Sequence, residues 1–126
     1  MSELLPLEPE ETNVCFQAFT ASVGLVSQEL YMGITGGTLA ELRASPKFPN
    51  SPDSVRFRGT TQVNTFDEFD NYGTRLSGYV IPPVSGNYNF FMSSDDQGEL
   101  WLSTDASPAN VVLIASEPQW NGRRDW

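Results

Sequence analysis

The chain lacks histidine and has a single cysteine, Cys15, among its 126 residues. Without imidazole it cannot form a Ser-His-Asp or Cys-His catalytic site, and without imidazole or a second thiolate it cannot form the common zinc centres. The lone cysteine also excludes a disulfide within the chain. Any metal must therefore be held by oxygen, which favours hard cations, and Ca²⁺ over Mg²⁺ where several protein oxygens converge.

Basic residues and long apolar runs are also scarce. Seven Lys and Arg stand against 16 Asp and Glu, a net charge of −9. Because this is the wrong sign for binding phosphates or an anionic membrane surface, we expect no nucleic-acid partner. The longest apolar run, Val111 to Ala115, has five residues, far fewer than the ~20 needed to span a bilayer. We therefore expect no direct membrane insertion.

The chain has room for one domain, since a second would be too small to sustain its own core. Residues 1–13 are polar, rich in Glu and interrupted by Pro6 and Pro9, unlike a secretory signal with its basic start and apolar stretch. We interpret residues 1–13 as a disordered acidic lead-in or the end of a linker, and residues 14–126 as the domain.

Short strands and tight turns are indicated by ten glycines and nine prolines at short intervals. A capping box of Thr38 and Glu41 predicts one short helix that begins at Leu39 and ends at Ser45 and Pro46. The spacing of the apolar segments, about ten residues, predicts an all-β fold, either a sandwich or a barrel. The segments interpreted as strands are one or two within Val14–Tyr31, one on each side of Gly59 (Val55 and Phe57, then Val63 and Phe66), Leu76–Ile81, Tyr88–Ser94, Leu100–Ser103 and Val111–Ala115.

Several longer motifs follow one another along the chain: LYMGITGGTLAEL, FPNSPDS, NYGTRLSGYVIPPVSGNYNF, SSDDQGELWLS, ASPANVVLIASEPQW and RRDW. In this order they resemble the protective-antigen fourteen-kilodalton domain family, a β-sandwich module of toxins, glycosidases, flocculin and adhesin lectins, and animal surface proteins. The resemblance covers about residues 24–126. It implies an antiparallel, jelly-roll-like β-sandwich that lacks the family's final strands at its C-terminus.

The resemblance also implies a binding site at Asp95 and Asp96. In the lectin branch of the family, two consecutive aspartates joined by a cis peptide hold a Ca²⁺ ion, which in turn binds two sugar hydroxyls directly. Asp95 and Asp96 are thereby expected to bind both metal and ligand, and the other calcium ligands would come from a later loop outside this chain.

Elementary electrostatics is consistent with a cation at this pair. Two carboxylates about 4 Å apart repel each other by roughly 4 kcal/mol at an effective dielectric constant near 20, and a divalent ion between them relieves that repulsion. Gly98 allows the chain to turn sharply after the pair. The alternative is a solvated Asp-rich turn between two strands that binds nothing.

Other acidic residues carry weaker hypotheses. Asp67, Glu68 and Asp70 do not have EF-hand spacing and are interpreted as a charged, exposed loop. Asp95 and Glu99 could in principle be the acid and base of glycoside cleavage, but nothing in the sequence sets their separation or their pKa values.

The aromatic residues have two interpretations. The residues that could stack on sugar rings are Tyr72, Tyr79, Phe90, Phe91 and Trp101. Because alternating aromatics in strands usually fill a sandwich core, we expect Tyr88, Phe90 and Trp101 in the core.

The function that these observations favour is a non-catalytic, calcium-dependent carbohydrate-binding module of a larger extracellular or cell-surface protein, with glycans or glycoproteins as partners. Two alternatives remain open. One is a structural or protein-interaction spacer that binds no sugar, and the other is an accessory insert of a glycoside hydrolase.

Overall fold

The structure, a computed structural model, describes residues 24–59, 61 and 68–122. Every strand pairing among these residues is antiparallel, and one short α-helix accompanies the strands, so the expected all-β, sandwich-like fold is confirmed. The elements in chain order are β1 (Val26–Met32), α2 (Leu39–Ala44), β2 (Ser54–Arg58), β3 (Tyr72–Ser77), β4 (Gly98–Ser103), the 3-10 turn η1 (Pro108–Asn110) and β5 (Val111–Glu117).

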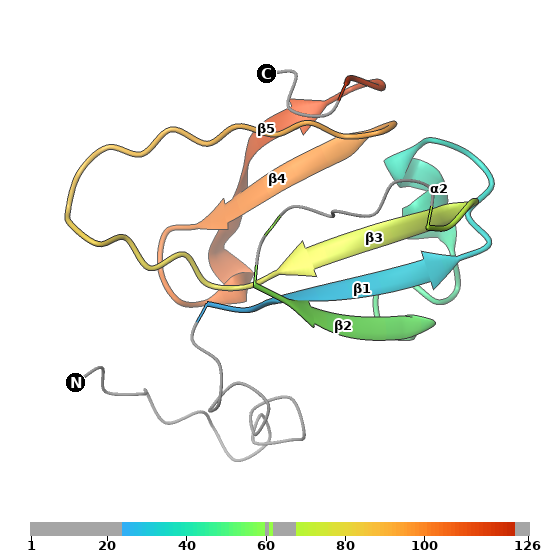
Figure 1. The fold of residues 1–126 in the computed structure, drawn as a ribbon, viewed down its shortest axis with the longest axis horizontal. Helices are drawn as coiled ribbons and strands as arrows, with labels where there is room; N and C mark the ends of the chain where they lie inside the picture. Colours follow the sequence, from blue (N-terminus) through green and yellow to red (C-terminus); the bar gives the residue numbers. More distant parts are fainter. Residues whose placement is uncertain (1–23, 60, 62–67, 123–126) are drawn as a thin grey trace, which may run out of the picture.

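The strands form two sheets, one with the order β2-β1-β3 and the other made of β4 and β5. Figure 1 shows the two-stranded sheet on the β3 side of the larger sheet, with α2 at the end where β1 finishes. In the smaller sheet the register shifts between Leu100 and Trp101. Such a bulge changes the direction in which the following side chain points.

Helix α2 begins and ends where its sequence predicts. The Glu41 amide donates to the Thr38 hydroxyl (3.2 Å) and the Thr38 amide donates to the Glu41 carboxylate (3.0 Å), which completes the capping box. At the other end the Ser45 amide donates to the Leu42 carbonyl. Pro46, which has no N–H to donate, prevents a further turn.

The core lies between β1 and α2. Tyr31, Ile34 and Leu42 are buried there, and Phe48 packs edge-on against the Tyr31 ring at 5.2 Å between centroids. Gly73 lies opposite Tyr31 in the sheet, and a Cβ at Gly73 would lie 2.7 Å from a Leu42 methyl group. The missing side chain at this position therefore lets the helix approach the sheet.

Two of the predicted strands are wrong. The chain leaves β3 at Ser77, and residues 78–97 form the long strandless loop that leads into β4 in Figure 1. The strand predicted for Leu76–Ile81 thus survives only in its first two residues, and Tyr88–Ser94 is not a strand. Pro82 and Pro83 cannot donate to a ladder, and no described strand pairs with this segment. Val63, Phe66 and residues 14–23 lie outside the described residues.

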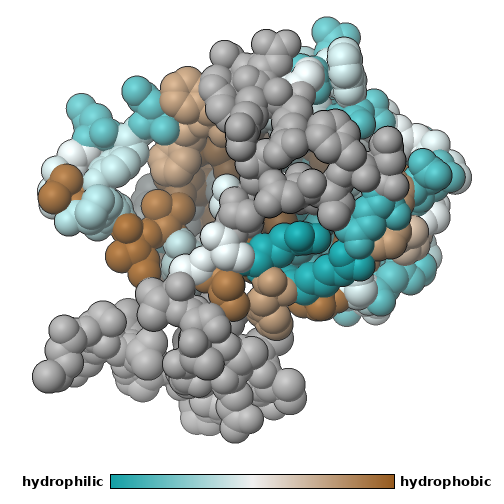
Figure 2. Space-filling model, viewed as in Figure 1, coloured by the Kyte–Doolittle hydropathy of each residue, from teal (hydrophilic) through white to brown (hydrophobic). Residues whose placement is uncertain are grey.

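The aromatic core predicted from the sequence is also wrong. Tyr88, Phe90 and Trp101 are 44%, 39% and 46% exposed. Tyr88 and Phe90 lie in the strandless loop, and Trp101 lies in β4 of the two-stranded sheet. Figure 2 accordingly shows apolar side chains at the surface near the end of the molecule where this loop lies.

Candidate functional site

Asp95 and Asp96 lie together in the turn that leads into β4, and both are exposed. The expected cis peptide between them is wrong: among the described residues the cis bond is Phe48–Pro49. Asp96 turns the chain instead, with φ at 58°, a left-handed conformation that Asp tolerates because its short polar side chain can bond locally. The linkage is therefore trans, but it is not an ordinary extended one.

Two adjacent glycines make room for two carboxylates. An added Cβ at Gly37 would lie 2.5 Å from the Asp96 carboxyl carbon, and one at Gly36 would collide with the Glu41 carboxylate. Glu41 is held by the helix cap, and its hydrogen bonds with Thr38 lower the pKa of its carboxyl. Asp96 is thus packed against the turn that precedes α2.

Gln97 ties this acidic corner to two distant segments. Its backbone N–H donates to the Gly37 carbonyl (3.1 Å), and its side-chain oxygen accepts from the Leu39 N–H at the start of α2 (3.1 Å). Its side-chain nitrogen donates to the Pro118 carbonyl (3.2 Å) beyond β5. One side chain therefore fixes the corner against both the helix and the end of the smaller sheet.

Asn121 fixes the corner from the other side. Its side-chain oxygen accepts from the Ser94 N–H (2.8 Å), and its own N–H donates to the Ser94 carbonyl (3.1 Å). Its side-chain nitrogen reaches the Glu117 carboxylate (2.9 Å). Sequence reasoning missed Gln97 and Asn121, and no local pattern could have found them, because their partners lie more than 20 residues away along the chain.

Glu99 does not suit the role of an acid in glycoside cleavage. Its carboxylate pairs with the Arg43 guanidinium and accepts from the Trp101 indole N–H (2.8 Å). Arg43 first, and then Trp101, holds the pKa of this carboxyl below its usual range, whereas a general acid at neutral pH needs a raised pKa. Glu68 pairs with Arg56, and Glu68 and Asp70 are both exposed, whereas Asp67 lies outside the described residues.

The acidic corner offers the carboxylate oxygens of Asp95 and Asp96 as possible metal ligands. Carboxylate oxygens are hard ligands of the type that Ca²⁺ binds, but Ca²⁺ takes six to eight oxygens. In the described part of the chain, no cluster of three or more acidic, His or Cys side chains is arranged to hold a metal. Asp95 and Asp96 could thus supply the charge, while carbonyls, water or ligand hydroxyls would have to complete the shell.

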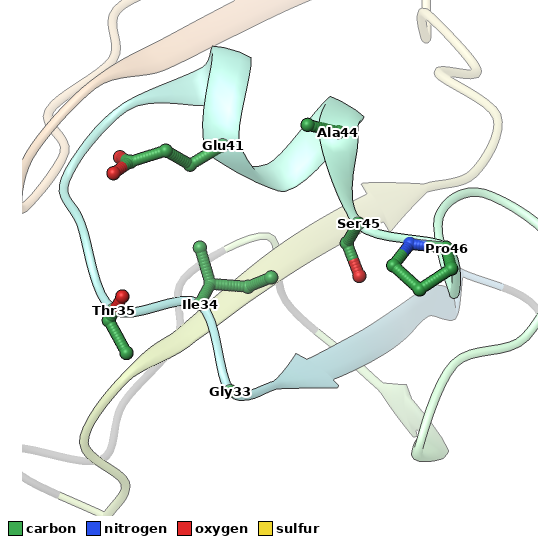
Figure 3. A pocket seen from close by; sticks show the side chains of 7 residues that line it. All are labelled: Gly33, Ile34, Thr35, Glu41, Ala44, Ser45 and Pro46. Atoms are coloured by element: carbon green, nitrogen blue, oxygen red, sulfur yellow. The ribbon is translucent and has the colours of Figure 1, made fainter.

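Two hollows lie near these elements. The smaller, about 280 Å³, lies between the end of β1 and α2. Figure 3 shows Ile34 between Thr35 and Pro46, with Glu41 and Ala44 on the helix beside them. Glu41, the one carboxylate in its lining, accepts hydrogen bonds from Thr38 in the helix cap. Glu41 is therefore not available as a catalytic acid in this hollow.

The larger hollow, about 570 Å³, lies between the strandless loop and the smaller sheet. It is lined by Tyr88, Asn89, Phe90, Phe91, Leu102 and Ile114. Neither hollow is lined by Asp95 or Asp96, so the acidic corner is a separate feature of the surface.

The fold agrees with a comparison against known families. The PA14 domain family matches residues 31–107, more than half of the chain. The chain belongs to the PA14 domain family. The matched region runs from β1 through α2, β2 and β3 into β4 and the turn after it, and it includes Asp95 and Asp96.

Curated relatives match along part of their length. A mouse (Mus musculus) N-acetyl-beta-glucosaminyl-glycoprotein 4-beta-N-acetylgalactosaminyltransferase 1 is 36% identical over 95 residues, covering 73% of this chain and 9% of the relative. Fibrocystin from the dog (Canis lupus familiaris) is 34% identical over 61 residues, and the match covers 48% of this chain and 1% of the length of fibrocystin. The chain thus spans less than a tenth of the length of these relatives. No solved structure matches it.

No helix in the described residues is both long enough and apolar enough to cross a bilayer.

Replacing Gln97 with Ala is expected to cost about 1–3 kcal/mol of unfolding free energy, because it leaves the partly buried Leu39 N–H and the Pro118 carbonyl without their partner. Urea denaturation of the two proteins measures the difference. Gln119→Ala, at an exposed position in the same segment as Pro118, is the control and should change stability by less than about 0.5 kcal/mol. Equal costs for the two variants would show that Gln97 does not hold the corner.

Proposed function

We propose that this PA14 domain is a non-catalytic glycan-binding module whose affinity depends on Ca²⁺ held at Asp95 and Asp96. The observation that carries the proposal is the placement of both acids, exposed, in one turn that is fixed from three sides by Gly37, Gln97 and Asn121. A fixed turn presents two carboxylates without an ordering cost on binding. Glu99, the acid considered for glycoside cleavage, has a lowered pKa because it pairs with Arg43.

In this proposal Asp95 and Asp96 hold the ion, and the ion offers open coordination positions to sugar hydroxyls. Neighbouring hydroxyls on a sugar ring are oxygen ligands of the hard type that Ca²⁺ accepts. Because the two aspartates would fill only part of a shell of six to eight oxygens, ligand hydroxyls and water would take the other positions.

The partners proposed are glycans or glycoproteins, met outside the cell or at its surface, and the module would act as part of a larger protein. One relative is by name a glycoprotein N-acetylgalactosaminyltransferase, which supports a role beside a glycan-modifying unit. The excess of acidic residues, a net charge of −9, favours neutral glycans over sulfated or sialylated ones, because like charges repel.

A glycan array probed with the chain in calcium buffer, and again in EGTA, tests this function. We expect binding to a set of neutral glycans in calcium and its loss in EGTA, with recovery when calcium is restored. Binding that is unchanged in EGTA would rule out the metal requirement, and a blank array in both buffers would rule out the glycan function.

A second candidate, a protein-interaction spacer, is favoured by one observation. The hollow of about 570 Å³ between the strandless loop and the smaller sheet is lined mainly by exposed aromatic and aliphatic side chains, and contiguous exposed apolar surface is typical of protein contacts. A blank glycan array together with a protein partner that no longer binds a Phe91→Ser variant would favour the spacer over the lectin.

A further inference from the structure

The side of β4 that faces α2 carries an exposed tryptophan held in place by polar contacts. The Trp101 indole N–H donates to Glu99 Oε2 (2.8 Å), and the same oxygen pairs with Arg43 Nη2 from the helix. The indole is nevertheless 46% exposed. Its orientation is thus set by a hydrogen bond to a charged pair and not by burial in a core.

The apolar surface continues onto the neighbouring strand. The register shift between Leu100 and Trp101 places Trp101 opposite Leu113, which is 47% exposed. Cross-strand partners present their side chains on the same face of a sheet. Trp101 and Leu113 therefore form a small, flat apolar surface with the Arg43–Glu99 pair at its edge, which we call the Trp101 platform.

This combination of surfaces matches the chemistry of one ligand class. A pyranose ring has an apolar face of C–H groups and a rim of hydroxyls. The indole face can pack against the C–H groups, and the Arg43–Glu99 pair at its edge can hydrogen-bond with the hydroxyls. A pre-oriented aromatic side chain also loses little conformational freedom on binding. Arg43 is already paired with Glu99, and the chain has a net charge of −9, so an anionic sugar is disfavoured.

We propose that the Trp101 platform stacks on a neutral sugar ring of the glycan whose other end is bound at Asp95 and Asp96. This inference rests on the proposed function. Gln97 and Glu99 both contact α2, and the Trp101 indole donates to Glu99, so the platform lies on the side of the molecule that also carries the acidic corner. Trp101 follows Asp96 by five positions, at most about 16 Å of extended chain. A short oligosaccharide can bridge this distance, and it is the ligand that we propose.

The test compares Trp101→Ala with the unaltered chain on an array of neutral oligosaccharides, their sialylated counterparts and their methyl monosaccharides, in calcium buffer. We expect oligosaccharide binding to weaken on the order of tenfold, equivalent to about 1.4 kcal/mol, with monosaccharide binding and calorimetric Ca²⁺ affinity unchanged. Trp120→Ala, which removes a tryptophan that is 63% exposed beyond β5, should change none of these.

The possible failures are distinguishable. If Trp101→Ala binds oligosaccharides as tightly as the unaltered chain while Asp95→Asn with Asp96→Asn does not, the platform is wrong and the proposed function stands. If Trp101→Ala weakens oligosaccharide, monosaccharide and Ca²⁺ binding equally, Trp101 supports the acidic corner and is no separate contact. If the unaltered chain binds no glycan, both proposals are wrong.

Discussion

Replacing both Asp95 and Asp96 with Asn is expected to weaken calcium-dependent glycan binding by roughly 100-fold or more. Removing even the outer partners of metal ligands commonly costs 10- to 100-fold in metal affinity, so the loss of two direct ligands should cost at least as much. Because both side chains are exposed, the unfolding free energy in calcium-free buffer should change by less than about 0.5 kcal/mol. Calorimetric titration with calcium and then with the glycan measures the loss, and denaturation in EGTA measures the stability.

A matched double variant controls for charge. Asp70→Asn with Asp105→Asn removes the same two negative charges from other exposed turns, and it should leave calcium and glycan binding within about twofold of the original, because screened surface charges act weakly at a distance. If this control lost as much binding as the Asp95 and Asp96 variant, the effect would belong to overall charge and the site assignment would be wrong.

Replacing Tyr31 with Ala is expected to cost about 3–5 kcal/mol of unfolding free energy, the range for deleting a large buried ring. Tyr31 has no exposed surface and packs against Phe48. Its hydroxyl is a hydrogen-bond donor that lies 2.9 Å from the Glu29 carboxylate and 2.8 Å from the Pro49 carbonyl. For a domain of this size such a loss is a large part of the total stability. Thermal or urea unfolding measures it.

Two further variants separate the ring from the hydroxyl. Tyr79→Ala removes a ring that is 67% exposed and should cost less than about 0.5 kcal/mol. Tyr31→Phe keeps the ring, and it should cost about 1–2 kcal/mol near neutral pH because two partly buried hydrogen bonds lose their donor. Similar costs for Tyr31→Ala and Tyr79→Ala would contradict the position of the core.

The Tyr31 hydroxyl should also make the free energy of unfolding depend on pH. Burial first, and then the hydrogen bond to Glu29, raises the pKa of Tyr31 from 10.0 to about 12. A group whose pKa is raised on folding contributes stability below its unfolded pKa and loses that contribution as the pH rises through the folded value. The stability difference between the original chain and Tyr31→Phe should therefore shrink between pH 10 and 12. A difference that stays constant over this range would contradict the buried hydroxyl.

Features set by a few neighbouring residues could be predicted from the sequence. The capping box of α2 depends on Thr38 and Glu41, three positions apart, and it forms as expected. The last two predicted strands correspond to β4 and β5, because each has a described partner for its backbone groups. Residues 88–94 alternate just as clearly but have no described partner strand, and alternation alone cannot supply one.

The acidic corner was located by an ordered set of motifs, but its construction could not be predicted. The sequence gives no sign that Gln97 reaches Leu39 and Pro118, or that Asp96 lies over Gly37. Trp101 shows the same limit. As an aromatic residue in a predicted strand it was expected in the core, whereas the register shift beside it and the hydrogen bond to Glu99 accompany a position at the surface.

Titration calorimetry of the chain with Ca²⁺, in the absence of glycan, tests the central claim most directly. The account predicts a single binding event per chain that is lost in the Asp95→Asn, Asp96→Asn variant and kept in the Asp70→Asn, Asp105→Asn control. Absence of calcium binding to the chain, or binding of equal strength in both double variants, would contradict it.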